Sequence, residues 1–358
     1  MELTRRNLFT LGAAATTCAV ASAGVALAGE AGAGSGQEAG QTSVNASGTV
    51  ANVSVTFEES VSENVLEIEN TQAVINEMQG VVYKQVATPF GVTTLKIDIL
   101  SPFVMPGDAL PLVVFINGGG FTGSDPSSNI TTRMALAKAG YVVASLQHRV
   151  VPNVTFPAPL EDLKAAVRWL RANASTYGID PARVAAVGNS SGGYFATMLG
   201  VTSETDEFDT GDNLDQSSAV SAVIDLYGVS DLTIIATGLG EDIEGSHYSA
   251  ASSEAMLVNG TAGGTSKGAS VFETPETAAK ASPFTYITEN SPAFLILHGD
   301  QDTLVSPVAS MELYKRLVDA GVEAERYVVA GAAHGDVLFD QPEIHQLMID
   351  FLDKHLGK

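Results

Sequence analysis

The sequence predicts an α/β domain in which helices flank both faces of a mostly parallel central sheet. Three observations lead to this prediction. The chain has 358 residues, of which 45% are hydrophobic and 16% charged, so it can bury a large core. Apolar runs alternate with amphipathic stretches, as strands and helices do in α/β proteins. The run at 111–117 (PLVVFIN) is almost wholly apolar, as expected for a strand buried on both faces of a parallel sheet.

The expected elements follow one another over residues 81–358. Residues 81–100 are predicted to form two strands around a Pro-Phe-Gly turn at 89–91. Further strands are expected at 111–117, 141–147, 184–188, 221–228, 293–299 and 325–331. Helices are expected at 131–139, 160–177, 307–320 and 342–356, and one more begins directly after residue 188. This alternation favours parallel strand pairing with helical crossovers.

Residues 1–28 have the layout of a cleavable export signal. Arg5 and Arg6 form a twin-arginine pair ahead of an uncharged, Ala-rich run that ends in Ala-Leu-Ala at Ala28. The run is rich in Ala, Gly and Thr, so it is too weakly hydrophobic for a membrane anchor. We therefore expect cleavage after Ala28, no integral membrane span in the mature chain, and a periplasmic, cell-surface or extracellular protein.

Composition excludes several classes of site and partner. Cys18 is the only cysteine and lies in the signal, so disulfides, thiolate metal sites and cysteine nucleophiles are excluded from the mature chain. The residues before Cys18 lack the apolar residue of a lipid-attachment site. The formal charge of −23 repels nucleic-acid phosphates and anionic membranes, so neither is an expected partner. No cofactor is expected, and no oligomeric state is indicated.

Four segments stand outside the regular pattern. Residues 29–48 are expected to be a flexible linker, and 49–80 an N-terminal extension without an assigned role. The acidic segment 203–218 does not have the spacing of a calcium-binding loop, so no metal site is expected there. Residues 235–282, rich in Gly, Ala, Ser and Thr, form either a lid over the carboxyl ends of the strands or an ordinary surface excursion.

The first chemical motif is GNSSG at 188–192, a GxSxG pattern. A predicted strand ends directly before it and a helix begins within it, which is the strand–turn–helix context of a nucleophile elbow. The flanking glycines are needed because the turn forces an unfavourable backbone at the serine and leaves no room for side chains beside it. Ser190 is therefore predicted to be a nucleophile.

A serine nucleophile needs a base, and His334 is the candidate because it lies in a Gly-flanked loop between a late strand and the last helix. Three other histidines are interpreted as structural, since they lie in that helix or end a buried strand: His298, His345 and His355. Two remain open as residues that line a pocket: His148 and His247.

An acid must orient the base, and the loop after strand 293–299 offers two. Asp302 is the stronger candidate, because Asp300 is expected to bond its own loop backbone. The glycine loop NGGG at 117–120 follows an early strand, where backbone N–H groups can stabilise an oxyanion. The expected donors of this oxyanion hole are the N–H groups of Gly118, Gly119 and Ser191.

The order Ser, Asp, His along the chain is typical of α/β-hydrolases. From about residue 81 onward the chain resembles the acetyl esterase and bifunctional feruloyl and acetyl-xylan esterase-like group of that fold. FINGGGF, GNSSGG, ASPFTYI and FLILHGDQDTLV carry the resemblance. Two departures from the family pattern stand out: Asn117 replaces the usual His of HGGG, and Gln-His-Arg at 147–149 replaces an Asp-Tyr-Arg-like triplet. Three charged residues are expected to form a structural ion-pair network: Arg149, Asp162 and Arg168.

The resemblance implies a serine hydrolase that cleaves carboxylic esters through an acyl-enzyme. Its substrates would be acetyl, feruloyl or other small acyl esters, as small molecules or linked to polysaccharides. An amide-cleaving relative with the same three residues, like an arylformamidase or a prolyl peptidase, is the alternative, and a non-catalytic binding module a further one. Candidate substrate contacts, which could equally pack the insertion down, are Phe121, Tyr248, Met256 and Leu257.

Overall fold

The computed structural model describes residues 67–71, 73–88, 91–103, 109–263 and 268–358. Residues 70–358 form one compact unit. The expected export signal, the linker and most of the N-terminal extension lie outside the described residues. None of the helices within the described ranges is long and apolar enough to cross a membrane.

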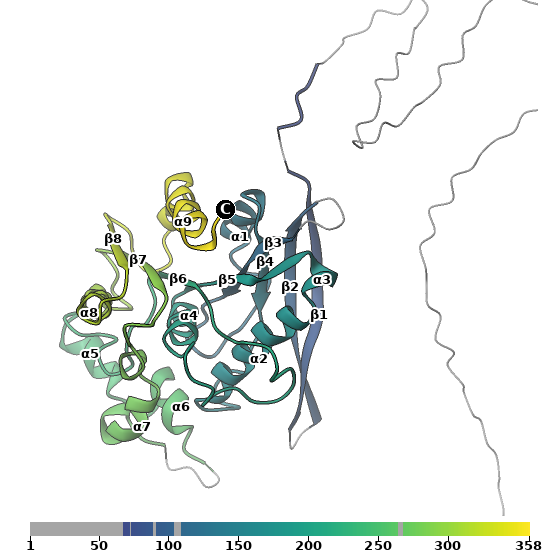
Figure 1. Ribbon diagram of the computed structural model, residues 1–358. Helices are drawn as coiled ribbons and strands as arrows, with labels where there is room; N and C mark the ends of the chain where they lie inside the picture. Colours follow the sequence, from purple (N-terminus) through teal and green to yellow (C-terminus); the bar gives the residue numbers. More distant parts are fainter. Residues whose placement is uncertain (1–66, 72, 89–90, 104–108, 264–267) are drawn as a thin grey trace, which may run out of the picture. The chain divides into compact units, whose positions relative to one another are not determined.

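An eight-stranded sheet in the order β1-β2-β4-β3-β5-β6-β7-β8 forms the centre of this unit (Figure 1). The pairs β1–β2 and β2–β4 are antiparallel, and the remaining pairs are parallel. The strands are β1 (Ile75–Thr88), β2 (Gly91–Pro102), β3 (Leu110–Ile116), β4 (Val142–Leu146), β5 (Ile179–Asn189), β6 (Ala222–Leu226), β7 (Ala293–Gly299) and β8 (Ala324–Val329). The mostly parallel sheet predicted from the sequence is confirmed.

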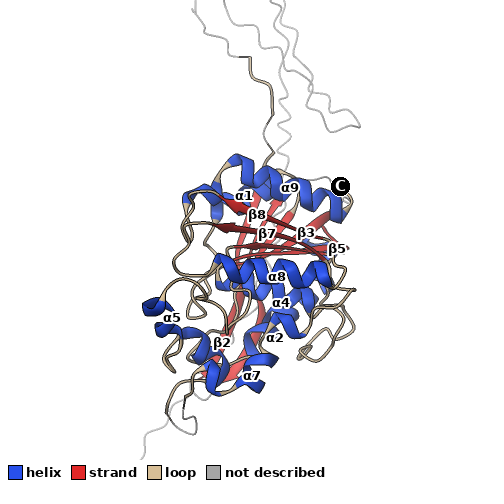
Figure 2. Ribbon diagram, turned by 90° about the vertical axis from the view of Figure 1, so that its left-hand side faces the viewer, coloured by secondary structure: helices blue, strands red, loops and turns tan. Residues whose placement is uncertain are grey.

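Helices cover the two faces of the sheet, as Figure 2 shows. One face carries α1 (Ile130–Lys138) and α9 (Pro342–Leu356). The other carries α2 (Ala158–Ala172), α4 (Ser191–Val201) and α8 (Pro307–Asp319), with the short α3 (Ala174–Tyr177) following α2. The segment 235–282 contributes α5 (Glu241–His247), α6 (Ser253–Asn259) and α7 (Pro275–Lys280), which lie together in the lower left of Figure 1.

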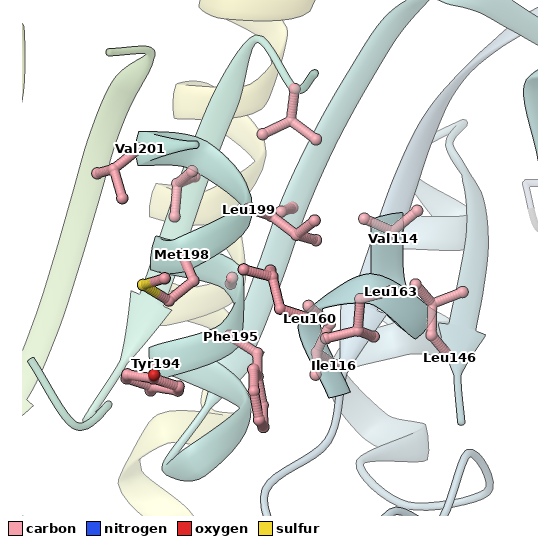
Figure 3. Packing of buried hydrophobic residues seen from close by; sticks show 14 of the residues in the cluster. Val114, Ile116, Leu146, Leu160, Leu163, Tyr194, Phe195, Met198, Leu199 and Val201 are labelled. Carbon is pink, nitrogen blue, oxygen red and sulfur yellow. The ribbon is translucent and has the colours of Figure 1, made fainter. Parts of the chain in front are cut away.

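The core continues through both faces of the central strands. In β3, Val113 and Phe115 face α1 and α9, whereas Val114 and Ile116 face α2 and α4, and all four are fully buried. Figure 3 shows the face of the sheet that α2 and α4 cover, where α4 packs beside α2 over this strand. Burial on both faces explains why this strand has a continuous apolar sequence rather than an alternating one.

Several boundaries differ from the sequence predictions, including the start of β5, which lies at Ile179 rather than at residue 184. Strand β1 begins at Ile75, so residues 75–80 of the expected extension belong to the sheet. This segment lies at the sheet edge and is mostly exposed, so its sequence carries little apolar pattern. The helix expected at 160–177 begins at Ala158 and is interrupted at Asn173, which separates α2 from α3.

The expected ion-pair network is wrong in one respect. Asp162 pairs with Arg149 (Nε–Oδ2 2.6 Å) and also with Lys84 (Nζ–Oδ1 2.7 Å). Arg168 instead pairs with Asp209, in a separate cluster. The physical reason is helical spacing: residues 162 and 168 are six apart on α2, and only residues three or four apart are neighbours on a helix surface.

Candidate active site

Three side chains from three loops meet at the carboxyl ends of the parallel strands. Ser190 follows β5, Asp302 follows β7 and His334 follows β8. The Ser190 Oγ lies 2.8 Å from His334 Nε2, and His334 Nδ1 lies 2.7 Å from Asp302 Oδ2. The structure therefore brings together the three residues that the sequence singled out, in the arrangement expected for a predicted nucleophile, base and orienting acid.

Ser190 occupies the tight turn between β5 and α4 with a positive φ of 53°. This backbone conformation is unfavourable for a residue with a side chain, and the surrounding packing must hold it. Gly192 shows how tight that packing is, since a Cβ there would lie 2.0 Å from the carbonyl oxygen of Ile116 on β3. The turn also places Ser190 at the amino end of α4, whose dipole favours developing negative charge.

The Asp302 carboxylate accepts four hydrogen bonds. Its Oδ1 accepts the backbone N–H groups of Leu304 (2.8 Å) and Val305 (2.9 Å). Its Oδ2 accepts from His334 Nδ1 (2.7 Å) and from His298 Nε2 (3.1 Å). Burial raises the pKa of Asp302, but these hydrogen bonds outweigh burial and hold that pKa well below its ordinary value. Asp302 is therefore ionised at neutral pH.

His298 is interpreted as structural from the sequence, and the structure adds a contact with Asp302 that the sequence did not predict. It is fully buried at the end of β7, only four residues before Asp302. The sequence signal that could have found it is this spacing, because the chain turns sharply after the strand and returns Asp302 to the strand end. Burial alone gave no indication of the partner.

The glycine loop lies directly beside the nucleophile. A Cβ on Gly118 would lie 2.8 Å from the Cβ of Ser190. The N–H of Gly118 donates to Asn189 Oδ1 (3.0 Å), and the N–H of Gly119 donates to Ser191 Oγ (3.0 Å). Both of the glycine donors predicted for an oxyanion hole are thus already engaged by side chains, which the sequence did not predict.

Three asparagines brace this loop. Asn117 Nδ2 donates to Ser145 Oγ (2.7 Å), and Asn117 Oδ1 accepts from Asn129 Nδ2 (2.7 Å). Asn129 Nδ2 also lies 3.2 Å from Asn189 Oδ1, the acceptor of the Gly118 amide. Asn117 thus provides the loop with a bracing contact in place of the family histidine. Asn129 and Asn189 were missed because nothing in their local sequence indicates a contact across 60 residues.

Tyr227 is a further residue that the sequence analysis missed. It has a positive φ of 42° directly after β6, and its ring packs edge-on against the His334 ring with centroids 5.0 Å apart. Its hydroxyl oxygen accepts from Asn189 Nδ2 (3.2 Å), and burial raises the pKa of that hydroxyl to about 12. As a neutral phenol, Tyr227 therefore contacts both the His334 ring and Asn189 of the asparagine cluster.

The two histidines left open as pocket residues each line a cavity, and each also contacts a neighbouring group. His148 is buried, its Nδ1 donates to the Arg149 carbonyl (2.8 Å), and its ring packs on Phe195 with centroids 4.8 Å apart. Burial lowers the pKa of His148. His247 Nδ1 contacts the buried carboxylate of Glu254 (2.7 Å) within the 235–282 segment.

The candidate substrate contacts divide into buried and exposed residues. Phe121 and Leu257 are buried in the core, and Met256 packs partly buried against it, so these three residues hold their segments in place. Tyr248 is 54% exposed and stacks edge-on with Phe272, at a centroid distance of 4.7 Å. The structure thus leaves Tyr248 accessible to a ligand.

The 235–282 segment is anchored to the site's surroundings by backbone contacts. The Ile235 carbonyl accepts from Ser306 N (2.7 Å), and the Leu257 carbonyl accepts from Phe156 N (2.7 Å). At its end, the Ala281 carbonyl accepts from the Tyr194 hydroxyl (2.6 Å), and Tyr194 belongs to the helix that follows Ser190. The described parts of the segment, 235–263 and 268–282, therefore form a packed helical insertion, and the role of the segment as a lid stays a prediction.

The chemistry that this geometry supports is acyl transfer to a serine hydroxyl. A hydroxyl bonded to a neutral imidazole, which is itself oriented by a carboxylate, is the arrangement that activates serine as a nucleophile. In the described part of the chain, no group of three or more His, Cys, Asp or Glu side chains could hold a metal ion.

Comparisons with known proteins agree with this chemistry. A family model described as BD-FAE matches residues 97–317. Esterase LipC of Mycobacterium tuberculosis is 28% identical over 238 residues, which cover 66% of this chain and 55% of LipC. Esterase LipQ of the same species is 27% identical over 243 residues, which cover 65% of this chain and 52% of LipQ. The chain thus spans about half the length of the curated relatives it matches.

Solved structures give the same result for the fold. A truncated carbohydrate esterase from gut microbiota aligns with a TM-score of 0.68 and 26% identity, covering 81% of this chain and 99% of that one. Esterase Est2 of Thermogutta terrifontis with bound propionate aligns with a TM-score of 0.59 and 25% identity, covering 80% of this chain and 94% of that one. This chain therefore has the α/β-hydrolase fold.

Proposed function

Because the chain belongs to the BD-FAE family, we propose that it is a serine esterase that cleaves carboxylic esters through an acyl-enzyme. The observation that supports this most directly is the continuous chain of hydrogen bonds from Ser190 through His334 to Asp302. The Ser190–His334 distance of 2.8 Å lies within the range required for proton transfer to a general base, and the His334–Asp302 distance of 2.7 Å is that of a hydrogen bond that orients the base.

The proposed reaction has two steps. His334 Nε2 takes the Ser190 proton as Oγ attacks the ester carbonyl, and then returns it to the leaving alcohol oxygen as the C–O bond breaks. Water, deprotonated by the same nitrogen, then attacks the acyl carbonyl; as the bond between the acyl carbon and Oγ breaks, His334 returns the proton to Oγ, which releases the acid and the free serine. Asp302, kept ionised by its four donors, stabilises the imidazolium form of His334 in both steps.

We assign the oxyanion contacts to the N–H groups of Ser191 and Gly119. The Gly119 N–H becomes available when the Ser191 hydroxyl that accepts it rotates away, whereas the Gly118 N–H stays with Asn189 and braces the loop. A single such donor typically contributes about 3 kcal/mol to the stabilisation of the transition state.

Small acyl esters are the proposed substrates, including acetyl and feruloyl groups on saccharides. The propionate bound to the Thermogutta terrifontis esterase and the carbohydrate esterase from gut microbiota support this class. We further propose that residues 1–28 direct export through the twin-arginine route, on the basis of Arg5-Arg6 and the Ala-rich run that follows.

The test combines Ser190→Ala with a panel of p-nitrophenyl esters of graded acyl length, acetylated xylan and methyl ferulate. We expect the wild-type protein to hydrolyse short acyl esters, and Ser190→Ala to lower kcat by about 10⁴-fold or more. The matched control is Ser175→Ala, which removes an exposed serine on α3 and should leave the rate unchanged.

Labelling by a fluorophosphonate probe separates esterase activity from the alternatives. A covalent adduct on Ser190 is expected in the wild-type protein and not in Ser190→Ala. Absence of any adduct would favour a binding module instead. Faster turnover of N-formylkynurenine or a peptide anilide than of every ester would place the chain among amide-cleaving enzymes. Unchanged ester hydrolysis by Ser190→Ala would contradict the mechanism.

A further inference from the structure

His298 is a second histidine that contacts the Asp302 carboxylate. It is the sixth residue of β7 and is fully buried. Its Nε2 lies 3.1 Å from Asp302 Oδ2 and 3.0 Å from the carbonyl oxygen of Val305. The same carboxylate oxygen accepts from His334 Nδ1 at 2.7 Å. Two imidazoles therefore share one oxygen of Asp302.

The partners of His298 fix its tautomer. A carboxylate and a carbonyl oxygen can only accept, so Nε2 must carry the proton and donate to both. Its Nδ1 has no hydrogen-bond partner among the described residues and is fully buried. Val305 also donates its N–H to Asp302 Oδ1, so the loop after β7 closes around the same histidine. The side chain is thus held as a fixed donor.

The charged groups around His298 come from each neighbouring element. Asp302 lies on its own loop and His334 on the loop after β8. Asp225 on β6 faces the same side of the sheet, because it pairs with Ile296, two residues before His298. Arg326 on β8 also pairs with Ile296, but its guanidinium donates to the Pro307 carbonyl (3.0 Å) and to Ser310 (3.2 Å). Asp302 is the group that His298 contacts.

We propose that His298 is a positioning residue of the reaction, which rests on the proposed function. Its N–H fixes the Asp302 carboxylate toward His334 and draws part of the negative charge of Oδ2 away from the imidazolium. A carboxylate with three donors instead of four would hold a protonated His334 more tightly. Removal of the His298 donor is therefore expected to strengthen the contact between Asp302 and His334, and the dependence of activity on pH reports that contact.

The first experiment compares His298→Met with His298→Gln. Met removes the donor and fills a similar volume, whereas the Gln amide places an N–H near the position of Nε2. The profile of kcat/KM against pH is measured with p-nitrophenyl acetate. We expect the acidic limb of His298→Met to move to higher pH by about half a unit to one unit. In His298→Gln the acidic limb should lie within a few tenths of a pH unit of its wild-type position.

An active His298→Met with an unchanged acidic limb would overturn the proposal, and so would an equal shift in both variants. An inert wild-type protein would instead refute the proposed function. If His298→Met does not fold, ¹⁵N-histidine NMR of the wild-type protein decides. A proton on Nε2 of His298 and none on Nδ1 at pH 7–8 supports the proposal, and the opposite tautomer overturns it.

Discussion

At the scale of single residues, Asp225 shows a carboxyl group that the fold buries without full compensation. It lies on β6 beneath the nucleophile turn, and a Cβ on Gly193 would lie 2.2 Å from its Oδ1. That oxygen has no hydrogen-bond partner within the described residues. Burial raises the pKa of Asp225 to about 7, against the opposing effects of His298 and the Gly228 N–H. A proton is thus bound more tightly in the folded state.

This pKa makes stability depend on pH. Because the folded-state pKa lies above the ordinary value of 3.8, the contribution of Asp225 to stability falls as pH rises from about 4 to about 7. Asp225→Asn removes the titration. We compare the unfolding free energy of the variant with that of the wild type at each pH. This difference is expected to favour the variant by about 3 kcal/mol more at pH 8 than at pH 5. Chemical denaturation at both values measures this difference.

The matched control is Asp215→Asn, which changes an exposed aspartate in a loop and should show the same small effect at both pH values. An equal effect of Asp225→Asn at pH 5 and pH 8 would show that the buried carboxyl does not titrate between them.

At the scale of elements, the turn from β5 into α4 depends on close contact with β3. The Gly192 backbone approaches the end of β3 so closely that an added Cβ would meet the Ile116 carbonyl at 2.0 Å. Backbone cannot move aside as a flexible side chain can, so the strand and the helix would have to separate. The same separation would displace Ser190 from His334.

Gly192→Ala is therefore expected to lower both stability and activity. Overpacking of this kind costs about 1–3 kcal/mol or more, and we expect a fall in kcat of at least tenfold as Ser190 moves. Thermal unfolding and ester hydrolysis measure the two effects. The control is Gly245→Ala on α5, where a Cβ meets nothing within 4 Å and should stabilise the helix by up to about 1 kcal/mol. Equal Tm values for the two variants would contradict this account.

The elements predicted best from the sequence are those buried on both faces. The strand at 293–299 was predicted with the bounds of β7, because its apolar run begins and ends abruptly. Residues 75–80 of β1 were missed because an exposed edge strand carries little apolar pattern. The contact of His298 with Asp302 and the contact of Asn129 with Asn189 were missed because both depend on which segments lie side by side in the fold. Patterns in a single sequence do not show how close two such segments lie.

At the scale of the whole molecule, the order and direction of the strands determine which loops meet at the site. Parallel strands end at one edge of a sheet, so loops after β5, β7 and β8 meet although Ser190 and His334 are 144 residues apart. This rule is why the three residues could be predicted together. The bracing by Asn117, by contrast, required the structure, because it joins the loop after β3 to Ser145 on the neighbouring strand.

The expected export signal would determine where the whole protein is located. A twin-arginine signal is read by its arginine pair, whereas the general secretory route requires only positive charge ahead of an apolar run. The double substitution Arg5→Lys and Arg6→Lys keeps that charge and removes the arginines. We expect it to hold the protein in the cytoplasm of a bacterial host that has the twin-arginine route, with unchanged activity per molecule. Fractionation followed by an ester assay measures the distribution.

The control is Arg316→Lys, an exposed residue of α8 paired with Glu312, which should be exported like wild type. Export of the double variant at the wild-type level would show that the pair is not the signal.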